Sequence, residues 1–525
     1  MTMGGDASDL ARWIKAFRAQ LSLADDEKVL RAVWSVNAIQ SGDANVDGAL
    51  LWDVPKDLEP GKMFSKRSIY PWELDTLANE LLTIPKHDFY RTFNCRSWRS
   101  LADIVNLLRN IENAEYGARR HVTSMYVEMG RIAARQFDWQ RGFFNVPDLY
   151  RSAFIYGQGA CAQHLADTYG LNINDLTFTG YALMAMYVDA PECAPMGDLS
   201  ELAHFGLPIA SFQKVLSRIS LPIDDIRAKA SRLRQPEQQT AYRPSILRRY
   251  PCVVFGRKRN RMIAPIPDLI AYRLTAGLFF DIVGGTGSVR NDCGKHFEAY
   301  SLSLLSKMLP EARFEPEWRY KVGRNHRDTS DIILFDGLGN VLLAIECKAR
   351  WMGAEVRFGE KPNVEKDYDE IISGVYQAWR FFSDCRRGLT GRSASPKAIG
   401  LVLALDEWFA ARSAALDRVI AEAHARADAN GDILAEDRRP IAFCSIHELE
   451  TVLKTATEES LLGALDDLAS KPKGWIFSSL HSDFDAPKTS CKPYPFHADL
   501  FEMLPWYQRI SMAAEDGRGW RGHSE

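Results

Sequence analysis

The chain has 525 residues, of which 46% are hydrophobic and 25% are charged, and its 65 Lys plus Arg against 68 Asp plus Glu give a formal net charge of −3. This balance is typical of a globular protein and excludes a disordered chain, a coiled coil, a collagen and a wholly basic nucleic-acid coat. At about 100–200 residues per domain, the length predicts roughly three to four domains.

Two features of the sequence bear on where the protein works. It contains no apolar run that approaches the ~20 residues of a membrane-spanning helix. Its N-terminal segment also lacks the charged-then-apolar layout of a secretory signal. We therefore expect a cytoplasmic protein without a membrane partner.

Helical periodicity dominates residues 1–240. Apolar residues recur at spacings of three and four in the segments 9–21, 99–114 and 198–219, whereas the β-branched alternation of strands is scarce. This pattern predicts an all-α N-terminal region. We expect this region to serve in recognition or interaction, with a substrate, a partner or a trigger as its target.

Residues 164–183 have the spacing of a helix-turn-helix, with Ala166 and Gly170 at the expected positions. The second helix offers no Lys or Arg to a duplex, although a reader of DNA normally contacts both phosphates and bases. Packing between helices is therefore the favoured interpretation, and DNA reading is the alternative.

Residues 241–284 are predicted to form a basic connector, in which a turn at 256–260 joins two short strands and a helix covers 268–282. No acidic residue interrupts 241–261, and aromatic residues are interleaved with the cations. Such a segment suits contacts with phosphates and stacking on unpaired bases, although a solvated arginine-rich turn would have the same composition. The cations proposed to bind nucleic acid are Arg248, Arg249, Arg257, Lys258, Arg259 and Arg261.

From residue 285 onward, helical segments alternate with short strands rich in β-branched residues. This order predicts a compact α/β domain over 285–470 with a mixed central sheet, followed by an extension at 471–525 of unknown role. The expected helices cover about 292–308, 365–385, a segment ending near 427 and a segment ending near 469. The expected strands cover 314–322, 331–335, 341–349, 399–405 and 441–446.

Two neighbouring strands carry the strongest chemical signal. Asp331 begins the first strand, and Glu346 and Lys348 lie in the second, where alternation places both side chains on one face. A short turn makes the strands antiparallel neighbours, which brings Asp331 toward Glu346. Charges inside apolar strands are costly to desolvate unless they are paired or bind a metal. A salt-bridge ladder on an exposed sheet face is the alternative.

This set of groups suits Mg²⁺, which prefers carboxylate and phosphate oxygens and keeps several waters. The metal can polarise a phosphodiester and acidify a bound water, while Lys348 positions or deprotonates the attacking water. Glu298 falls on the apolar side of the preceding helix. It is either a residue at the rim of the core or a further metal ligand.

At these residues the sequence resembles the PD-(D/E)XK nuclease superfamily, which has the restriction-endonuclease-like fold, over about 285–455. The residues that carry the resemblance are Gly294, Phe297 and Glu298 on the leading helix, Ser330 and Asp331 on one strand, and Glu346, Cys347 and Lys348 on the next. Ser330 stands where the family name has proline, at a position that varies within the family.

The resemblance implies a role for each of these charged residues. Asp331, Glu346 and Glu298 would bind Mg²⁺, for which Mn²⁺ can substitute, and Lys348 would be the catalytic lysine. Members of the family often carry a glutamine on the following helix, and Gln377 is the candidate here. Its position opposite the apolar stripe of that helix fits a surface residue equally well.

These features predict a multidomain protein whose activity is Mg²⁺-dependent hydrolysis of phosphodiester bonds in DNA, and the resemblance suggests bacterial defence against foreign DNA. Arg324 and Arg327 could contact the phosphates of the substrate. One alternative keeps the enzyme but changes its substrate to RNA or branched DNA. The other is a non-catalytic nucleic-acid-binding assembly subunit, against which the intact catalytic set argues. A homodimer or a partner protein is compatible with cleavage of both strands.

Overall fold

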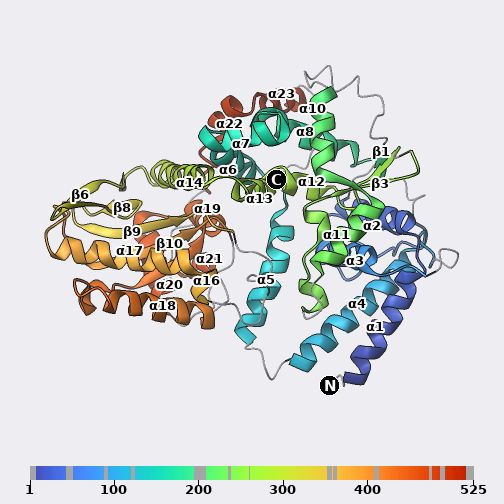
Figure 1. Ribbon diagram of the computed structural model, residues 1–525, viewed down its shortest axis with the longest axis horizontal. Helices are drawn as coiled ribbons and strands as arrows, with labels where there is room; N and C mark the ends of the chain where they lie inside the picture. The colour runs from blue at the N-terminus through green and yellow to red at the C-terminus, as the bar shows by residue number, and fades with distance from the viewer. Residues whose placement is uncertain are drawn as a thin grey trace. The chain divides into compact units, whose positions relative to one another are not determined.

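The computed structural model describes residues 7–42, 51–87, 93–119, 125–193, 209–234, 238–258, 260–351, 358, 364–406, 413–471, 476–484 and 491–515 (Figure 1). The chain divides into two compact units. Unit 1 comprises Met1–Val122, Arg135–Gly285 and Ala498–Glu525, and unit 2 comprises Thr123–Ala134 and Thr286–His497. Among the described residues, no helix combines the length and the apolar character that crossing a bilayer requires.

Unit 1 is mainly helical, as the spacing of its apolar residues predicts, and side chains such as Trp34, Leu77 and Leu108 are buried in its core. Its helices include α1 (Ala7–Ser22), α2 (Asp26–Ser41), α3 (Pro71–Thr83), α4 (Trp98–Arg119), α6 (Val146–Tyr156), α7 (Gly159–Tyr169), α8 (Ile173–Met186), α10 (Ile209–Ile219), α11 (Ile223–Leu233), α12 (Asp268–Arg273), α13 (Phe279–Val283) and α23 (Pro505–Glu515). Two helices, α5 (Met125–Arg141) and α22 (His497–Met503), contribute residues to both units. The predicted N-terminal helical region is confirmed.

The prediction that residues 1–240 are all-α is wrong in one respect, because two short segments are strands. A four-stranded sheet has the order β1-β4-β3-β2. Its strands are β1 (Glu192–Cys193), β2 (Ser220–Pro222), β3 (Cys252–Phe255) and β4 (Arg261–Ile263). β1 and β2 are too short to show an alternating pattern, and pairing with the β3–β4 hairpin stabilises them. The predicted turn of that hairpin is present and has Gly256 at a φ of 85°.

The helix predicted over 268–282 is interrupted. This segment consists of α12, the 3-10 turn η3 (Ala276–Leu278) and α13. Thr275 leaves the helical conformation, with a ψ of −102°, and its hydroxyl donates to the Ala271 carbonyl at 2.7 Å. A threonine side chain that bonds to the backbone competes with the helical ladder, which apolar periodicity alone does not reveal.

The segment with helix-turn-helix spacing consists of α7 and α8. Gly170 ends α7 at a φ of 68°, and the side chain of Asn172 caps α8. Thr177 and Thr179 are buried, and the indole N–H of Trp506 donates to the Thr177 hydroxyl at 3.0 Å. Because these threonines of α8 pack inside unit 1, the structure favours helical packing over DNA reading.

Unit 2 is built around a mixed five-stranded sheet, as the sequence predicts (Figure 1). The strand order is β11-β10-β9-β8-β5, with β10 parallel to β9 and β11, and β8 antiparallel to β9 and β5. The strands are β5 (Arg313–Pro316), β8 (Ile332–Phe335), β9 (Val341–Lys348), β10 (Ala394–Ala404) and β11 (Ile441–Ser445). The parallel pair β9–β10 is connected through a helical segment, since parallel strands need a crossover.

Helices pack on both faces of this sheet. Val375 and Trp379 of α17 (Asp369–Arg386) pack with Val402 of β10, while α14 (Gly287–Met308) contacts β9 and β5. Because side chains alternate along β9, Glu346 and Lys348 face α17, and the intervening residue faces away from it. The other helices of unit 2 are α16 (Val364–Asp367), α18 (Ser413–Asp428), α19 (Ile446–Leu453), α20 (Glu458–Ser470) and α21 (Phe477–Asp483).

Three predicted segments of unit 2 are each divided in the structure. The helix expected over 365–385 consists of α16 and α17. The strand expected over 314–322 is β5 followed by β6 (Arg319–Val322), and β6 pairs with β7 (Asn325–Asp328) in a separate two-stranded sheet. The final helix is divided into α19 and α20, because Thr457 caps a new helix by accepting a hydrogen bond from the Ser460 N–H at 3.2 Å. Within 471–525, for which no structure was predicted, the described part contains α21, α22 and α23.

Candidate functional site

Asp331 lies where β8 begins, next to the end of β9. Ile332 of β8 pairs with Ile345 of β9 in antiparallel register, so Asp331 stands opposite Glu346. The Asp331 carboxylate accepts a hydrogen bond of 2.6 Å from the backbone N–H of Cys347. The strand pairing that the sequence predicts therefore brings these two acids to the same end of the sheet.

Lys348 is held between two polar side chains. Its Nζ donates to Glu346 Oε2 at 3.0 Å and to Gln377 Oε1 at 2.9 Å. The side chain of Glu346 is 3% exposed and that of Lys348 is 15% exposed, so this ion pair is largely removed from water. The sequence left open whether Gln377 lies at the surface or near the lysine, and the structure places it in direct contact with the lysine.

α17 approaches β9 closely at Gly374. A Cβ at this position would lie 3.0 Å from Lys348 Cε and 3.5 Å from Glu346 Cβ, and the first of these distances is tighter than ordinary van der Waals contact. α17 therefore contacts the lysine twice, at its stem through Gly374 and at its ammonium through Gln377. No motif identifies this glycine in the sequence, because its role depends on how closely a helix and a strand approach.

Glu298 approaches the same group of charges from α14. Burial, together with the neighbouring carboxylate of Glu317, raises the pKa of Glu298, and the charges of Lys348 and Glu346 also act on it. The sequence allowed either a position at the rim of the core or a place among the site acids. The electrostatic coupling to Glu346 and Lys348 favours the second interpretation.

Carboxylates outnumber the ammonium in this group. Burial and the adjacent carboxylate of Glu346 raise the pKa of Asp331 well above its ordinary value. Burial by itself lowers the pKa of Lys348, but the carboxylates of Glu346 and Asp331 outweigh that effect and raise it above its ordinary value. Lys348 is therefore charged at neutral pH, and the surrounding acids repel one another.

The donor set fits a hard divalent cation. Its ligands would be carboxylate oxygens, which suit Mg²⁺ or Mn²⁺ better than a soft metal. A cation bound by Asp331 and Glu346 would relieve the repulsion between these two acids. Glu298 could complete the set directly or through a water, so the chemistry of these residues fits the metal that the sequence predicts.

Sequence reasoning missed Glu317, an exposed acid between β5 and β6. Its backbone N–H donates to the Asp331 carbonyl at 2.9 Å, which extends the β5–β8 pairing by one residue beyond Pro316 and Ile332. Its carboxylate raises the pKa of Glu298. The segment around Glu317 shows no motif, so only the register of the sheet could have identified it.

Two of the predicted nucleic-acid-binding cations of the connector form ion pairs inside unit 1. Arg261 donates two hydrogen bonds to Glu27, at 2.9 and 2.8 Å. Arg248 donates to Asp138 at 3.3 Å, and its guanidinium lies over three aromatic rings. These contacts give both arginines a structural role, and any role in binding nucleic acid stays a prediction.

The other predicted cations differ in exposure. Arg249, Arg257, Lys258 and Arg324 are exposed, whereas Arg259 lies outside the described residues. Arg327 pairs with the buried carboxylate of Asp384 at 2.9 Å. Among the described residues of 241–261, the charges of Arg248 and Arg261 are therefore paired with acids of unit 1, whereas Arg249, Arg257 and Lys258 are exposed.

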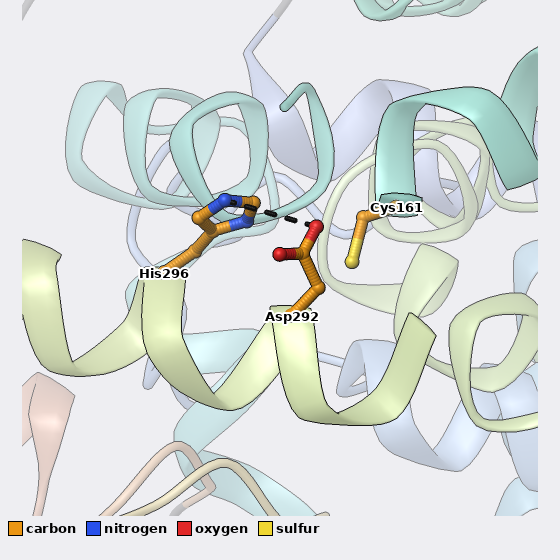
Figure 2. A group of neighbouring side chains, drawn as sticks. All are labelled: Cys161, Asp292 and His296. Atoms are coloured by element: carbon orange, nitrogen blue, oxygen red, sulfur yellow. Dashed lines mark ion pairs between the residues drawn. The ribbon is translucent and has the colours of Figure 1, made fainter. Parts of the chain in front are cut away.

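Asp292 and His296 lie one turn apart on α14, and Figure 2 shows their side chains. His296 Nε2 is 3.9 Å from Asp292 Oδ2. The contact is an i,i+4 pair that gains charge–charge attraction only when the imidazole is protonated. Cys161, which the figure also labels, belongs to unit 1.

No family model matches this chain, and neither a curated protein nor a solved structure is significantly similar to it. The residues at the ends of β8 and β9 and their geometry are therefore the basis for a functional proposal.

Proposed function

We propose that unit 2 is a Mg²⁺-dependent nuclease of the PD-(D/E)XK type, with a restriction-endonuclease-like fold, that hydrolyses phosphodiester bonds in DNA. The observation that carries this proposal is the meeting of Asp331, Glu346, Lys348 and Gln377 at the end of two antiparallel strands. A cytoplasmic location and a role in bacterial defence against foreign DNA belong to the same proposal.

Each residue of the site has a distinct task in this mechanism. When held by Asp331 and Glu346, Mg²⁺ supplies Lewis-acid polarisation of the phosphodiester and a more acidic water. Lys348, oriented by Glu346 and Gln377, directs its ammonium at the charge that develops on the phosphate. Its hydrogen bonds to Glu346 and Gln377 hold the Lys348 ammonium in place as a positive charge and a hydrogen-bond donor. The raised pKa of Glu298 suits it to accept a proton from water.

The direct test uses the purified full chain with linear duplex, circular duplex and single-stranded DNA and with RNA, each in Mg²⁺, Mn²⁺ or EDTA. We expect cleavage of DNA with either metal, no cleavage in EDTA, and no cleavage by Asp331→Ala. Cleavage of RNA but not of DNA would show that RNA is the substrate. Cleavage only of branched DNA, added as a further substrate, would show that branched DNA is the substrate. Binding of nucleic acid without cleavage would support a non-catalytic assembly subunit, and cleavage in EDTA would contradict the proposal.

Gly374→Ala tests how the lysine is positioned. The added methyl group would press on the Lys348 stem, so we expect kcat to fall about tenfold, with KM nearly unchanged, because small misplacements of a catalytic group are costly. Alanine favours a helix over glycine by about 1 kcal/mol, which offsets the local crowding, so the Tm should change little.

Gly117→Ala is the matched control for this variant, because Gly117 also lies in a helix and a Cβ there would meet nothing within 4 Å. Single-turnover kinetics and thermal unfolding of both variants give the comparison. An unchanged kcat in Gly374→Ala would show that the close approach of α17 has no part in positioning the lysine.

A further inference from the structure

The β6–β7 hairpin continues the strands that carry the site acids. β6 and β7 pair in antiparallel register from Arg319 and Asp328 to the tip. Beyond the base of the hairpin, the Thr329 backbone N–H donates to the Trp318 carbonyl at 3.1 Å. One residue further, the Glu317 backbone N–H donates to the Asp331 carbonyl. The hairpin is therefore attached directly to the segment that ends in Asp331.

One side of the hairpin is anchored to α17. Tyr320 and Arg327, which pair across the hairpin, donate to Asp384 Oδ2 at 2.6 and 2.9 Å. Asp384 is fully buried, so this contact fixes the hairpin against the helix. The Trp318 ring packs on Phe381 of α17 at the base of the hairpin. These contacts hold the hairpin rigidly beside the site.

The opposite side of the hairpin carries cations. Lys321 and His326 pair across the strands and are exposed, and Arg324 is exposed in the turn. Within the part of the chain that the structure describes, neither Lys321 nor Arg324 forms an ion pair with a carboxylate. Alternation places Arg319 and Asp328 on this side too, and they neutralise each other at 2.8 Å. The remaining residues on this side form a net positive surface that contains no Phe, Tyr or Trp.

We propose that the β6–β7 hairpin is an arm that binds the sugar–phosphate backbone of duplex nucleic acid through Lys321, Arg324 and His326. This inference rests on the proposed nuclease function and adds the means by which the substrate is held. Lysine and arginine bind phosphates by charge attraction and hydrogen bonds, which gives affinity without sequence preference. Among the described outward residues there is no Phe, Tyr or Trp, and this favours a duplex over unpaired bases, which bind mainly by stacking on such rings.

The test measures binding to labelled duplex DNA by fluorescence anisotropy across a salt series, in Ca²⁺ so that binding is separated from cleavage. Lys321→Ala with Arg324→Ala should weaken binding about tenfold or more at 0.15 M salt and reduce the slope of log K against log salt by about two. Both side chains are exposed, so the Tm should stay the same.

Lys397→Ala with Lys454→Ala is the matched control, because these lysines are exposed and lie on β10 and at the end of α19. It removes the same charge and should leave the salt slope unchanged. If the hairpin variant and the parent bind duplex DNA with equal affinity, the hairpin does not bind the backbone, and the nuclease proposal is unaffected. Binding of single strands but not of duplex DNA by the parent protein would also contradict the proposed role of the hairpin and leave the nuclease proposal intact. If the parent binds no nucleic acid, both the hairpin proposal and the nuclease proposal are wrong. If it binds duplex DNA through the hairpin but does not cleave it, only the nuclease proposal is wrong.

Discussion

Lys348→Met is expected to lower the rate of phosphodiester cleavage by about 10²–10³-fold, the effect of removing one preorganised donor from a catalytic site. Methionine retains most of the side-chain volume and removes only the charge that Glu346 and Gln377 orient. Binding of duplex DNA should persist, because the Lys348 side chain is only 15% exposed and would act mainly on the reacting phosphate.

The loss of the ammonium should also affect stability. Glu346 would retain a buried carboxylate without its counter-ion, which costs about 3 kcal/mol when one partner of a buried pair is removed. Circular dichroism and thermal unfolding would show whether Lys348→Met is folded, and Lys348→Gln provides a second variant that can still donate to Glu346. Lys397→Met, at an exposed position of β10, controls for the loss of a lysine. Full activity of a folded Lys348→Met or Lys348→Gln protein would remove the lysine from the mechanism.

Asp331→Asn is expected to abolish cleavage and yet to raise the Tm of the metal-free protein at neutral pH by several degrees. Burial and the Glu346 carboxylate raise the pKa of Asp331, so the charged form opposes folding. A neutral amide removes that repulsion. About 1 kcal/mol corresponds to roughly 2–4 °C for 150–250 residues. Mg²⁺ should raise the Tm of the parent and have little effect on Asp331→Asn.

The pH dependence has a defined sign. Because the folded pKa of Asp331 lies above its unfolded value of about 3.9, protonation at low pH favours the folded state, and this contribution is lost as the pH rises through the folded pKa. In EDTA, the Tm advantage of Asp331→Asn should therefore grow as the pH rises from about 4.

Asp336→Asn is a control of opposite sign. Hydrogen bonds from the side chain and backbone N–H groups of Asn340 lower the pKa of Asp336, so its charged form favours folding. Asp336→Asn should therefore lower the Tm at neutral pH. A metal-free Asp331→Asn protein that is less stable than the parent at neutral pH would contradict the electrostatic account of the site.

The pattern of apolar residues predicted the parts of the fold that follow local periodicity. Helical periodicity correctly predicted α1, α4 and α10, while residues 198–208 of the predicted segment 198–219 lie outside the described residues. The alternation along β9 and its antiparallel pairing with β8 through a short turn were also predicted correctly. Side-chain alternation along β9 also predicted that Glu346 and Lys348 face the same side of the sheet. These features depend on residues that are close in the sequence.

The remaining features depend on contacts between distant segments. Gly374 and Gln377 reach Lys348 because α17 packs on β9, and Glu317 lies beside Asp331 only through the pairing of β5 with β8. The strands β1 and β2 form through pairing with a hairpin far along the chain. The charge on Arg248 and Arg261 was visible in the sequence, but the acids that neutralise it were not identifiable.

Gln377 and Asp384 are separated by two turns of α17, about 10 Å, and lie on the same side of the helix. Gln377 orients the lysine, and Asp384 anchors the hairpin. If unit 2 is the proposed nuclease, this helix would hold the proposed phosphate-binding hairpin at a fixed distance from the proposed catalytic lysine. Inserting one residue between the two positions would rotate one by about 100° relative to the other and would separate these two proposed tasks.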